Sequence, residues 1–239
     1  MRLLAFLLLF LTLSATVLTR AADAPPEAGY VSLFNGKDLT GWSYKGSKEK
    51  LSGKTHTADG RVVVEDGVIV MKAKDVDGKS AIKELRTSKE YAKGFHLKLE
   101  FKASLKSDSG VYVRGPQLQV RDFIRRGEQK HLKKFIDDGW NTLDIIVRDD
   151  RVLATVDNKL LGPKDDLNVT VEKGKAAATF NGKKIDAKGV QFRMGSVAEC
   201  LCNGEPLEVM LNIPAKGAIG LQAETGEFAF RKIRVKELE

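Results

Sequence analysis

Strict alternation of apolar and polar residues constrains this chain more than any other feature. The segment 95–102 reads Phe-His-Leu-Lys-Leu-Glu-Phe-Lys, so its apolar residues all share one face: Phe95, Leu97, Leu99 and Phe101. A period of two is typical of strands that bury one face. It recurs at 111–114, 117–121, 143–147 and 219–223. The sequence therefore predicts an all-β protein.

Turn-forming dipeptides separate these strands. Asn-Gly or Asp-Gly pairs occur at 35–36, 66–67, 77–78, 181–182 and 203–204. Many short strands divided by such turns fit a sandwich of two antiparallel sheets. In the last strand, Phe228 and Phe230 are in phase whereas Ile233 and Val235 are shifted by one, which predicts a β-bulge near residues 231–232.

Three further segments allow local predictions. Lys83–Tyr91 is polar and is expected to be a loop or a single turn, whereas Glu128–Ile136 has apolar residues at helical spacing and allows a short helix. Cys200 and Cys202 are two apart in an expected strand, so both point to one face. A disulfide between them would be strained, and we expect small buried side chains rather than a redox pair.

The amino terminus resembles a secretory signal. Arg2 precedes an apolar run, Leu3–Leu13, and small residues follow at Ala21 and Ala22. We therefore expect residues 1–22 to be a signal peptide, 23–29 a short linker and 30–239 one domain. The run is too short for a transmembrane span, so the protein is expected to be exported, periplasmic or extracellular, without stable membrane insertion.

The formal net charge of +8 falls to +6 once Arg2 and Arg20 are removed with the leader. The remaining basic residues either alternate with apolar ones along strands or are scattered through loops, which favours a solvated lysine-rich surface. The alternative is an anionic-polymer surface. Export argues against nucleic acid as a partner.

The sequence lacks the common catalytic and cofactor motifs. It contains no Walker loop, no dinucleotide Gly-x-Gly-x-x-Gly, no His-Glu-x-x-His and no Gly-x-Ser-x-Gly. Its three histidines, His56, His96 and His131, lack metal-ligand spacing, so we expect neither metal nor cofactor. The alternating Glu-x-Asp-x-Glu of β-sandwich glucanases is also missing. Spacing alone leads to an exported all-β sandwich whose partner is unknown.

Longer segments carry a family resemblance. Residues 30–42 read Tyr-Val-Ser-Leu-Phe-Asn-Gly-Lys-Asp-Leu-Thr-Gly-Trp, and the further matching segments are 91–101, 109–114, 220–222 and 230–235. Together they resemble the 3-keto-disaccharide hydrolase domain family of secreted bacterial proteins. The resemblance spans nearly all of residues 30–238 and is weakest between 162 and 214.

The resemblance implies a concanavalin A-like jelly roll that cleaves glycosides oxidised to a ketone at sugar carbon three. Such a ketone acidifies the hydrogen on carbon two, so a base can expel the glycosidic oxygen from carbon one by elimination, after which water adds. The site then needs one general base and one group that polarises the ketone oxygen. The expected partner is therefore an oxidised glycoside.

One position departs from the family pattern. The strand that usually reads Tyr-Glu-x-Gln-Ile-x-Asp reads Pro-Gln-Leu-Gln-Val-Arg-Asp here, over residues 116–122. Gln119 and Asp122 match, but Gln117 replaces the glutamate and cannot accept a proton as a base. This substitution leaves open a second reading, a carbohydrate-binding module of the same fold without catalysis. A third is a structural protein of the cell envelope.

Candidate site residues follow from the alternation and the resemblance. Tyr112, Arg114, Gln117, Gln119 and Arg121 are expected on one polar face that could bind sugar hydroxyls. The alternative is that they are only solvated. Asp122 is the first candidate for proton transfer and Glu100 the second. Trp140 could stack on a sugar ring, as could Trp42, although core packing is the alternative for both.

Overall fold

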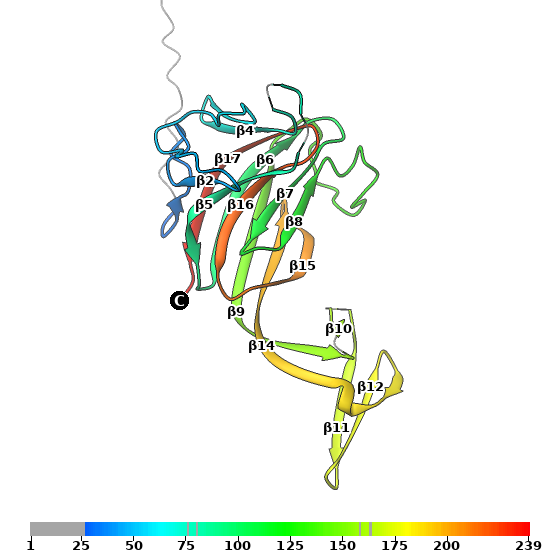
Figure 1. Ribbon diagram of the computed structural model, residues 1–239. Coiled ribbons are helices and arrows are strands. Elements are labelled where there is room, and N and C mark those ends of the chain that lie inside the picture. The colour runs from blue at the N-terminus through cyan, green and yellow to red at the C-terminus, as the bar shows by residue number, and fades with distance from the viewer. Residues whose placement is uncertain (1–26, 76, 80, 158, 163) are drawn as a thin grey trace, which may run out of the picture.

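The computed structural model describes residues 27–239 except 76, 80, 158 and 163. The predicted signal peptide, residues 1–22, lies outside the described residues, as does most of the predicted linker. Strands dominate the described part, and its one helical element is the short 3-10 turn Ala187–Gly189. Figure 1 shows two stacked sheets with a long arm projecting from one end.

The larger sheet contains nine antiparallel strands. In order of pairing they are β15 (Glu205–Ile213), β14 (Val190–Cys202), β9 (Asn141–Val156), β6 (Phe95–Ala103), β17 (Glu227–Glu237), β4 (Val68–Lys72) and β3 (Val62–Glu65), with β1 (Val31–Ser32) beside β17 and β10 (Lys159–Leu160) beside β9. We call this the nine-stranded sheet.

The second sheet contains five antiparallel strands. In order of pairing they are β2 (Trp42–Tyr44), β5 (Lys83–Tyr91), β16 (Gly217–Ala223), β7 (Asp108–Val113) and β8 (Gln117–Arg121). A separate three-stranded sheet, β11 (Leu167–Glu172), β12 (Lys175–Phe180) and β13 (Lys183–Ile185), lies on the arm. We define the arm as residues 151–195, which include the outer halves of β9 and β14.

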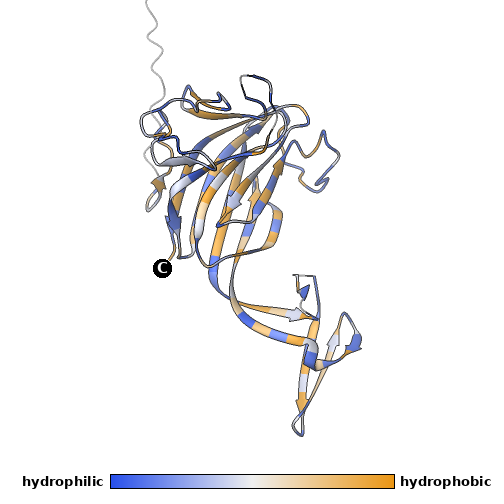
Figure 2. Cartoon of the chain, viewed as in Figure 1, coloured by the Kyte–Doolittle hydropathy of each residue, from blue (hydrophilic) through white to orange (hydrophobic). Residues whose placement is uncertain are grey.

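One hydrophobic core lies between the two large sheets. Phe95, Leu97, Leu99 and Phe101 are all fully or almost fully buried, as their alternation predicts. The five-stranded sheet contributes the inward residues of its own strands to the same cluster: Leu85, Val111, Val113, Leu118, Val120, Ile219 and Leu221. Figure 2 shows the resulting alternation of polar and apolar residues along the strands. The predicted all-β jelly-roll sandwich of two antiparallel sheets is confirmed.

Local predictions were partly right. The bulge near 231–232 is confirmed, because the pairing of β17 with β6 shifts between Arg231 and Arg234 and Lys232 has φ 51°. Cys200 and Cys202 are buried free thiols, as expected. The prediction for 128–136 was wrong, since this segment forms turns rather than a helix.

The largest error concerns Lys83–Tyr91, which is not a loop but a strand inside the five-stranded sheet, β5. Its polar composition has two causes. Its outward side chains belong to the polar surface described below, and one of its inward positions is Thr87, which is buried and hydrogen-bonds through its hydroxyl to backbone groups.

Candidate functional site

The outward side of the five-stranded sheet carries a row of residues aligned by strand register. Ser43 pairs with Arg86, Arg86 with Gly220, Gly220 with Tyr112 and Tyr112 with Gln117. Because paired residues point to the same side of a sheet, this row crosses all five strands on one face. The inward neighbours of these residues fill the core, so the row faces away from it.

A second row lies next to the first. Glu84 pairs with Gln222, and Gly110 pairs with Gln119. The amide of Lys45 donates to the carbonyl of Glu84, which brings Lys45 to the same end of the sheet. We call the outward side chains of both rows the polar face: Ser43, Lys45, Glu84, Arg86, Tyr112, Gln117, Gln119 and Gln222.

The glycine at position 110 is required by close packing on this face. A Cβ at Gly110 would overlap the side chain of Gln117, which folds across the glycine. There the amide of Gln117 donates to the side-chain oxygen of Gln222. The Gln222 amide donates in turn to the Tyr112 hydroxyl, at 3.1 Å. The absence of a side chain at 110 therefore permits a chain of hydrogen bonds between neighbouring strands.

Charged groups continue this network on the other side of Tyr112. The Arg86 guanidinium lies 5.5 Å from the centre of the Tyr112 ring, and its Nε donates to Glu84 at 2.8 Å. Lys45 Nζ also donates to Glu84, at 2.7 Å. The polar face is therefore a connected array of hydroxyl, amide, carboxylate and guanidinium groups, which are the groups that recognise sugar hydroxyls.

The protonation states of two members follow from their surroundings. Burial, together with the nearby Glu84 carboxylate, raises the pKa of Tyr112 to about 12. Burial also tends to raise the pKa of Glu84, but hydrogen bonds from Lys45 and Arg86 outweigh it and lower this pKa overall. At neutral pH the face therefore presents a neutral phenol that can donate a hydrogen bond and an ionised carboxylate already held by two cations.

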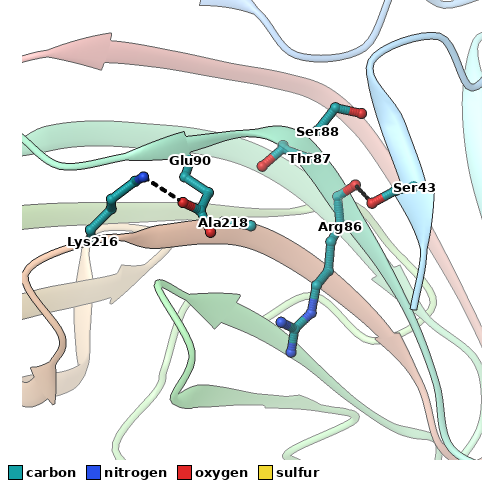
Figure 3. Close-up of a pocket in the computed structure, with 7 residues that line it drawn as sticks. All are labelled: Ser43, Arg86, Thr87, Ser88, Glu90, Lys216 and Ala218. Carbon is teal, nitrogen blue, oxygen red and sulfur yellow. Dashed lines mark hydrogen bonds and ion pairs between the residues drawn. The ribbon is translucent and has the colours of Figure 1, made fainter. Parts of the chain in front are cut away.

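A pocket of about 450 Å³ adjoins the polar face at the end where β2, β5 and β16 meet. Figure 3 shows its lining: Ser43, Arg86, Thr87, Ser88, Glu90, Lys216 and Ala218. Glu90 and Lys216 form an ion pair at 2.8 Å and remain about half exposed. Arg86 belongs both to the pocket and to the polar face. The pocket therefore combines an open carboxylate with two cationic groups, and it is continuous with the hydrogen-bonding row.

Of the five residues predicted for one polar face, the structure brings together Tyr112, Gln117 and Gln119. Arg121 points to the same side of β8, where it is ion-paired with Asp108 and Glu128. Arg114 does not lie on this face, which corrects the expectation drawn from alternation. It has φ 54° at the β7–β8 turn, so the alternation of β7 ends before it. Its side chain is fully buried, with Nη1 2.5 Å from Asp149 and the guanidinium 5.5 Å from the centre of the Phe95 ring.

Asp122 is also not on the polar face. It is fully buried just beyond the end of β8, where its Oδ2 accepts from the amide of Lys106 and from Arg125 Nε, each at 2.7 Å. The expectation that Asp122 exchanges protons with a substrate is therefore at odds with its burial. Its role in the structure is to hold two loops together.

Glu100 and Trp140 lie on the opposite side of the sandwich. Glu100 points outward from β6 in the nine-stranded sheet and pairs with Arg231 at 2.7 Å and Lys232 at 2.9 Å. Burial tends to raise the pKa of Glu100, but these two cations lower it. The Arg231 guanidinium lies 3.9 Å from the centre of the Trp140 ring. The core separates this cluster from the polar face. Trp42 is buried, and its indole donates to Leu33 O at 2.9 Å.

Several members of the site were missed from the sequence: Glu84, Arg86, Glu90, Lys216 and Gln222. Glu84 and Arg86 flank the buried Leu85, and this short alternation was a usable signal for a strand. Lys216 and Glu90 gave no signal, because only the pairing of β5 with β16 brings them together. Among the described residues, no group of three or more His, Cys, Asp or Glu side chains is arranged to hold a metal ion. The described part of the chain also forms no helix with the length and hydropathy that a bilayer-crossing segment needs.

Comparisons with solved structures found distant similarity. A protein provisionally described as a glycosyl hydrolase from Parabacteroides distasonis ATCC 8503 is 18% identical, with a TM-score of 0.45, and the match covers 88% of this chain and 94% of that one. The carbohydrate binding module CBM66 from Bacillus subtilis is 9% identical, with a TM-score of 0.31, covering 87% and 96%. A β-1,3-1,4-glucanase (lichenase) from a mouse hindgut metagenome is 12% identical, with a TM-score of 0.33, covering 87% and 98%.

No curated protein matches the chain. A family model does, and it covers most of the sequence: the model of the 3-keto-alpha-glucoside-1,2-lyase-like domain matches residues 29–236. This match agrees with the resemblance noted in the sequence. The chain therefore belongs to the family of 3-keto-alpha-glucoside-1,2-lyase-like domains.

Proposed function

We propose that this chain cleaves the glycosidic bond of 3-keto-glycosides, using the polar face and its adjoining pocket. The family supports the substrate class. The observation that carries the proposal is the pocket, where the Glu90 carboxylate lies with the cations of Lys216 and Arg86 beside a row of sugar-binding groups. An elimination needs a base and a cationic group for the ketone oxygen, and this pocket supplies both.

In the proposed reaction, Glu90 removes the hydrogen from carbon two of the oxidised sugar. Arg86 and Lys216 stabilise the negative charge that develops on the oxygen at carbon three. A double bond then forms between carbons one and two as the bond from carbon one to the glycosidic oxygen breaks, and the departing oxygen takes a proton. Water adds across the double bond and yields the free 3-keto sugar. Tyr112, Gln117 and Gln119 bind hydroxyl groups along the polar face, and the buried Gln222 holds Gln117 and Tyr112 in place.

We assign proton transfer to Glu90 rather than to Asp122 or Glu100, because Glu90 is the one of the three that lines the pocket. Asp122 is fully buried, and Glu100 lies on the far side of the core. Glu90 keeps a side chain that is 53% exposed and lines a pocket large enough for a sugar ring.

Incubation of the protein with a panel of 3-keto-glycosides, followed by mass spectrometry, tests the proposal. Release of a free 3-keto sugar is expected, and Glu90→Gln should lower kcat at least about a hundredfold with a small change in KM. Glu199→Gln is the matched control, because Glu199, like Glu90, is partly exposed and ion-paired with a basic residue, but it lies on the nine-stranded sheet. Equal turnover by Glu90→Gln and the control would exclude Glu90 as the base.

A carbohydrate-binding module without catalysis is the second candidate function, and Gln117 is the observation that favours it. An amide stands where the family pattern has a carboxylate, and it is bound into the network through Gln222. Sugar binding by the wild-type chain without product at any pH would support this function. Gain of turnover by Gln117→Glu would then show that the base of this site had been replaced.

We also propose that the protein acts outside the cytoplasm, on the basis of the leader-like residues 1–22. The intact mass of the protein recovered from its native host tests this. A mass that includes residues 1–22 would contradict export by a cleaved signal.

A further inference from the structure

The arm exposes an apolar surface that the sandwich does not cover. Beyond the sandwich, the pairing seen among the described residues of β9 and β14 is with each other and briefly with β10, which leaves a narrow ribbon. Val152 pairs directly with Met194, and the next outward pair along the ribbon is Ala154 with Phe192. The side chains of Val152, Met194 and Phe192 are 65%, 62% and 59% exposed.

These residues form one patch rather than isolated exposures. Paired residues and their second neighbours lie on the same side of a two-stranded ribbon, so Val152, Met194 and Phe192 are adjacent. Val169 and Val171 of β11, on the same arm, are also exposed. Figure 2 shows hydrophobic residues along the strands of the arm. An exposed apolar patch on a ribbon of this kind indicates a docking surface.

The positive charge of the arm indicates that its partner is anionic. Residues 151–195 contain nine Lys or Arg against five Asp or Glu, so the arm carries half of the formal net charge of +8. Lys159 pairs with Val156, which pairs with Val190, so by register this lysine lies on the apolar side of the ribbon. Lys173 and Lys175 flank the glycine at the β11–β12 turn. A second copy of the chain would oppose this charge with the same charge, whereas an anionic surface complements it.

We propose that the arm docks on the surface of an anionic lipid bilayer. Val152, Phe192 and Met194 enter the region between headgroups and acyl chains, and the lysines of the arm meet lipid phosphates. Proteins that bind a bilayer without crossing it do so by burying apolar side chains among the lipids and by electrostatic attraction of basic side chains to anionic headgroups. The five-stranded sheet and its pocket take no part in this contact, so the proposal does not rest on the proposed function.

Vesicle sedimentation tests the proposal. The purified chain is mixed with phosphatidylcholine vesicles, with and without phosphatidylglycerol, and every variant carries the same amino terminus so that residues 1–22 contribute equally. We expect binding only to the vesicles that contain phosphatidylglycerol, and weaker binding in high salt. The double variant Phe192→Ser with Met194→Ser should weaken binding about tenfold or more.

Two further variants keep the test decisive. Lys159→Gln with Lys173→Gln should weaken binding and reduce its salt dependence while leaving the apolar patch intact. Leu105→Ser is the matched control, because Leu105 is 67% exposed but lies on the sandwich, and it should leave binding unchanged. Absence of binding to anionic vesicles, or equal binding by the serine double variant, would overturn the proposal. So would a wild-type dimer, measured by sedimentation velocity, that the double variant abolishes.

Discussion

Replacing Arg114 by methionine tests whether this residue is structural or contacts sugar. Its guanidinium is fully buried, and Nη1 lies 2.5 Å from Asp149, whose side chain is 33% exposed. Nη2 donates to the carbonyl of Lys93. Methionine keeps most of the packing against Phe95 but supplies no donor, so both acceptors lose their partner.

The size of the effect follows from these contacts. A hydrogen bond to a charged group contributes about 1.5–3 kcal/mol, and breaking a buried ion pair costs about 3–5 kcal/mol. Water can reach Asp149 in part, so we expect the lower end, about 3 kcal/mol in the free energy of unfolding. In urea, with a slope of about 3 kcal/mol per M for a domain of this size, the unfolding midpoint should fall by about 1 M.

The pH dependence supplies an independent check. Burial tends to raise the pKa of Asp149, but its hydrogen bond from Arg114 and the charge of that guanidinium lower the pKa overall. A carboxyl group with a lowered folded-state pKa adds stability above its unfolded pKa of about 3.9, and this stability is lost as pH falls through the folded value. The difference in stability between wild type and Asp149→Asn should therefore be full at pH 7 and shrink below about pH 4.

Urea unfolding followed by tryptophan fluorescence measures these effects, with Arg114→Met, Asp149→Asn and the double variant forming a cycle. We expect a coupling energy of about 1–3 kcal/mol between the two positions. If the urea midpoint of Arg114→Met equals that of the wild type while sugar binding is weaker, this reasoning is refuted and Arg114 contacts sugar.

Three other predictions follow from single contacts. Burial raises the pKa of both the Cys200 and the Cys202 thiol to about 12, so neither should react with iodoacetamide at pH 8 until urea unfolds the chain, as mass spectrometry can show. Gly110→Ala should displace Gln117, lower the melting temperature through a cost of about 1–3 kcal/mol, and weaken sugar binding; an unchanged melting temperature would contradict the packing described, and an unchanged affinity would contradict sugar binding at this face. Trp140→Ala should cost about 1 kcal/mol through loss of the stacked guanidinium yet leave the calorimetric sugar affinity unchanged, and a large loss of affinity would place sugar on the nine-stranded sheet.

The fold could be predicted where one face of a strand is buried and the other is exposed to solvent. Residues 95–102 meet this condition at every position, and their burial follows the alternation without exception at the apolar sites. β5 does not meet it, because Thr87 occupies an inward position and a register shift interrupts its pairing with β16 between Ala218 and Gly220. A strand that carries a functional surface and a bulge loses the regular pattern by which strands are predicted.

The candidate site could be predicted only within a strand. Alternation places Tyr112 correctly, but it cannot be extended through the turn to Arg114, where the backbone takes a positive φ. It also cannot show that Glu100 and Tyr112 belong to different sheets, since both point outward from strands of the same sandwich. Assigning outward residues to one site requires the order of the strands, which the local pattern does not contain.

The same limit explains why the pocket carboxylate was not found. Family patterns place a carboxylate on β8, and with Gln117 there the nearest acid along the sequence is Asp122, which the turn after β8 buries. Glu90 lies on another strand and reaches the polar face only through the pairing of β5 with β16. Without the β8 glutamate, the carboxylates on the same side as Tyr112 that strand pairing brings to this site are those of β5, Glu84 and Glu90. Glu84 is already bound by Lys45 and Arg86, whereas Glu90 is half open to solvent, so proton transfer at this site is expected to depend on Glu90.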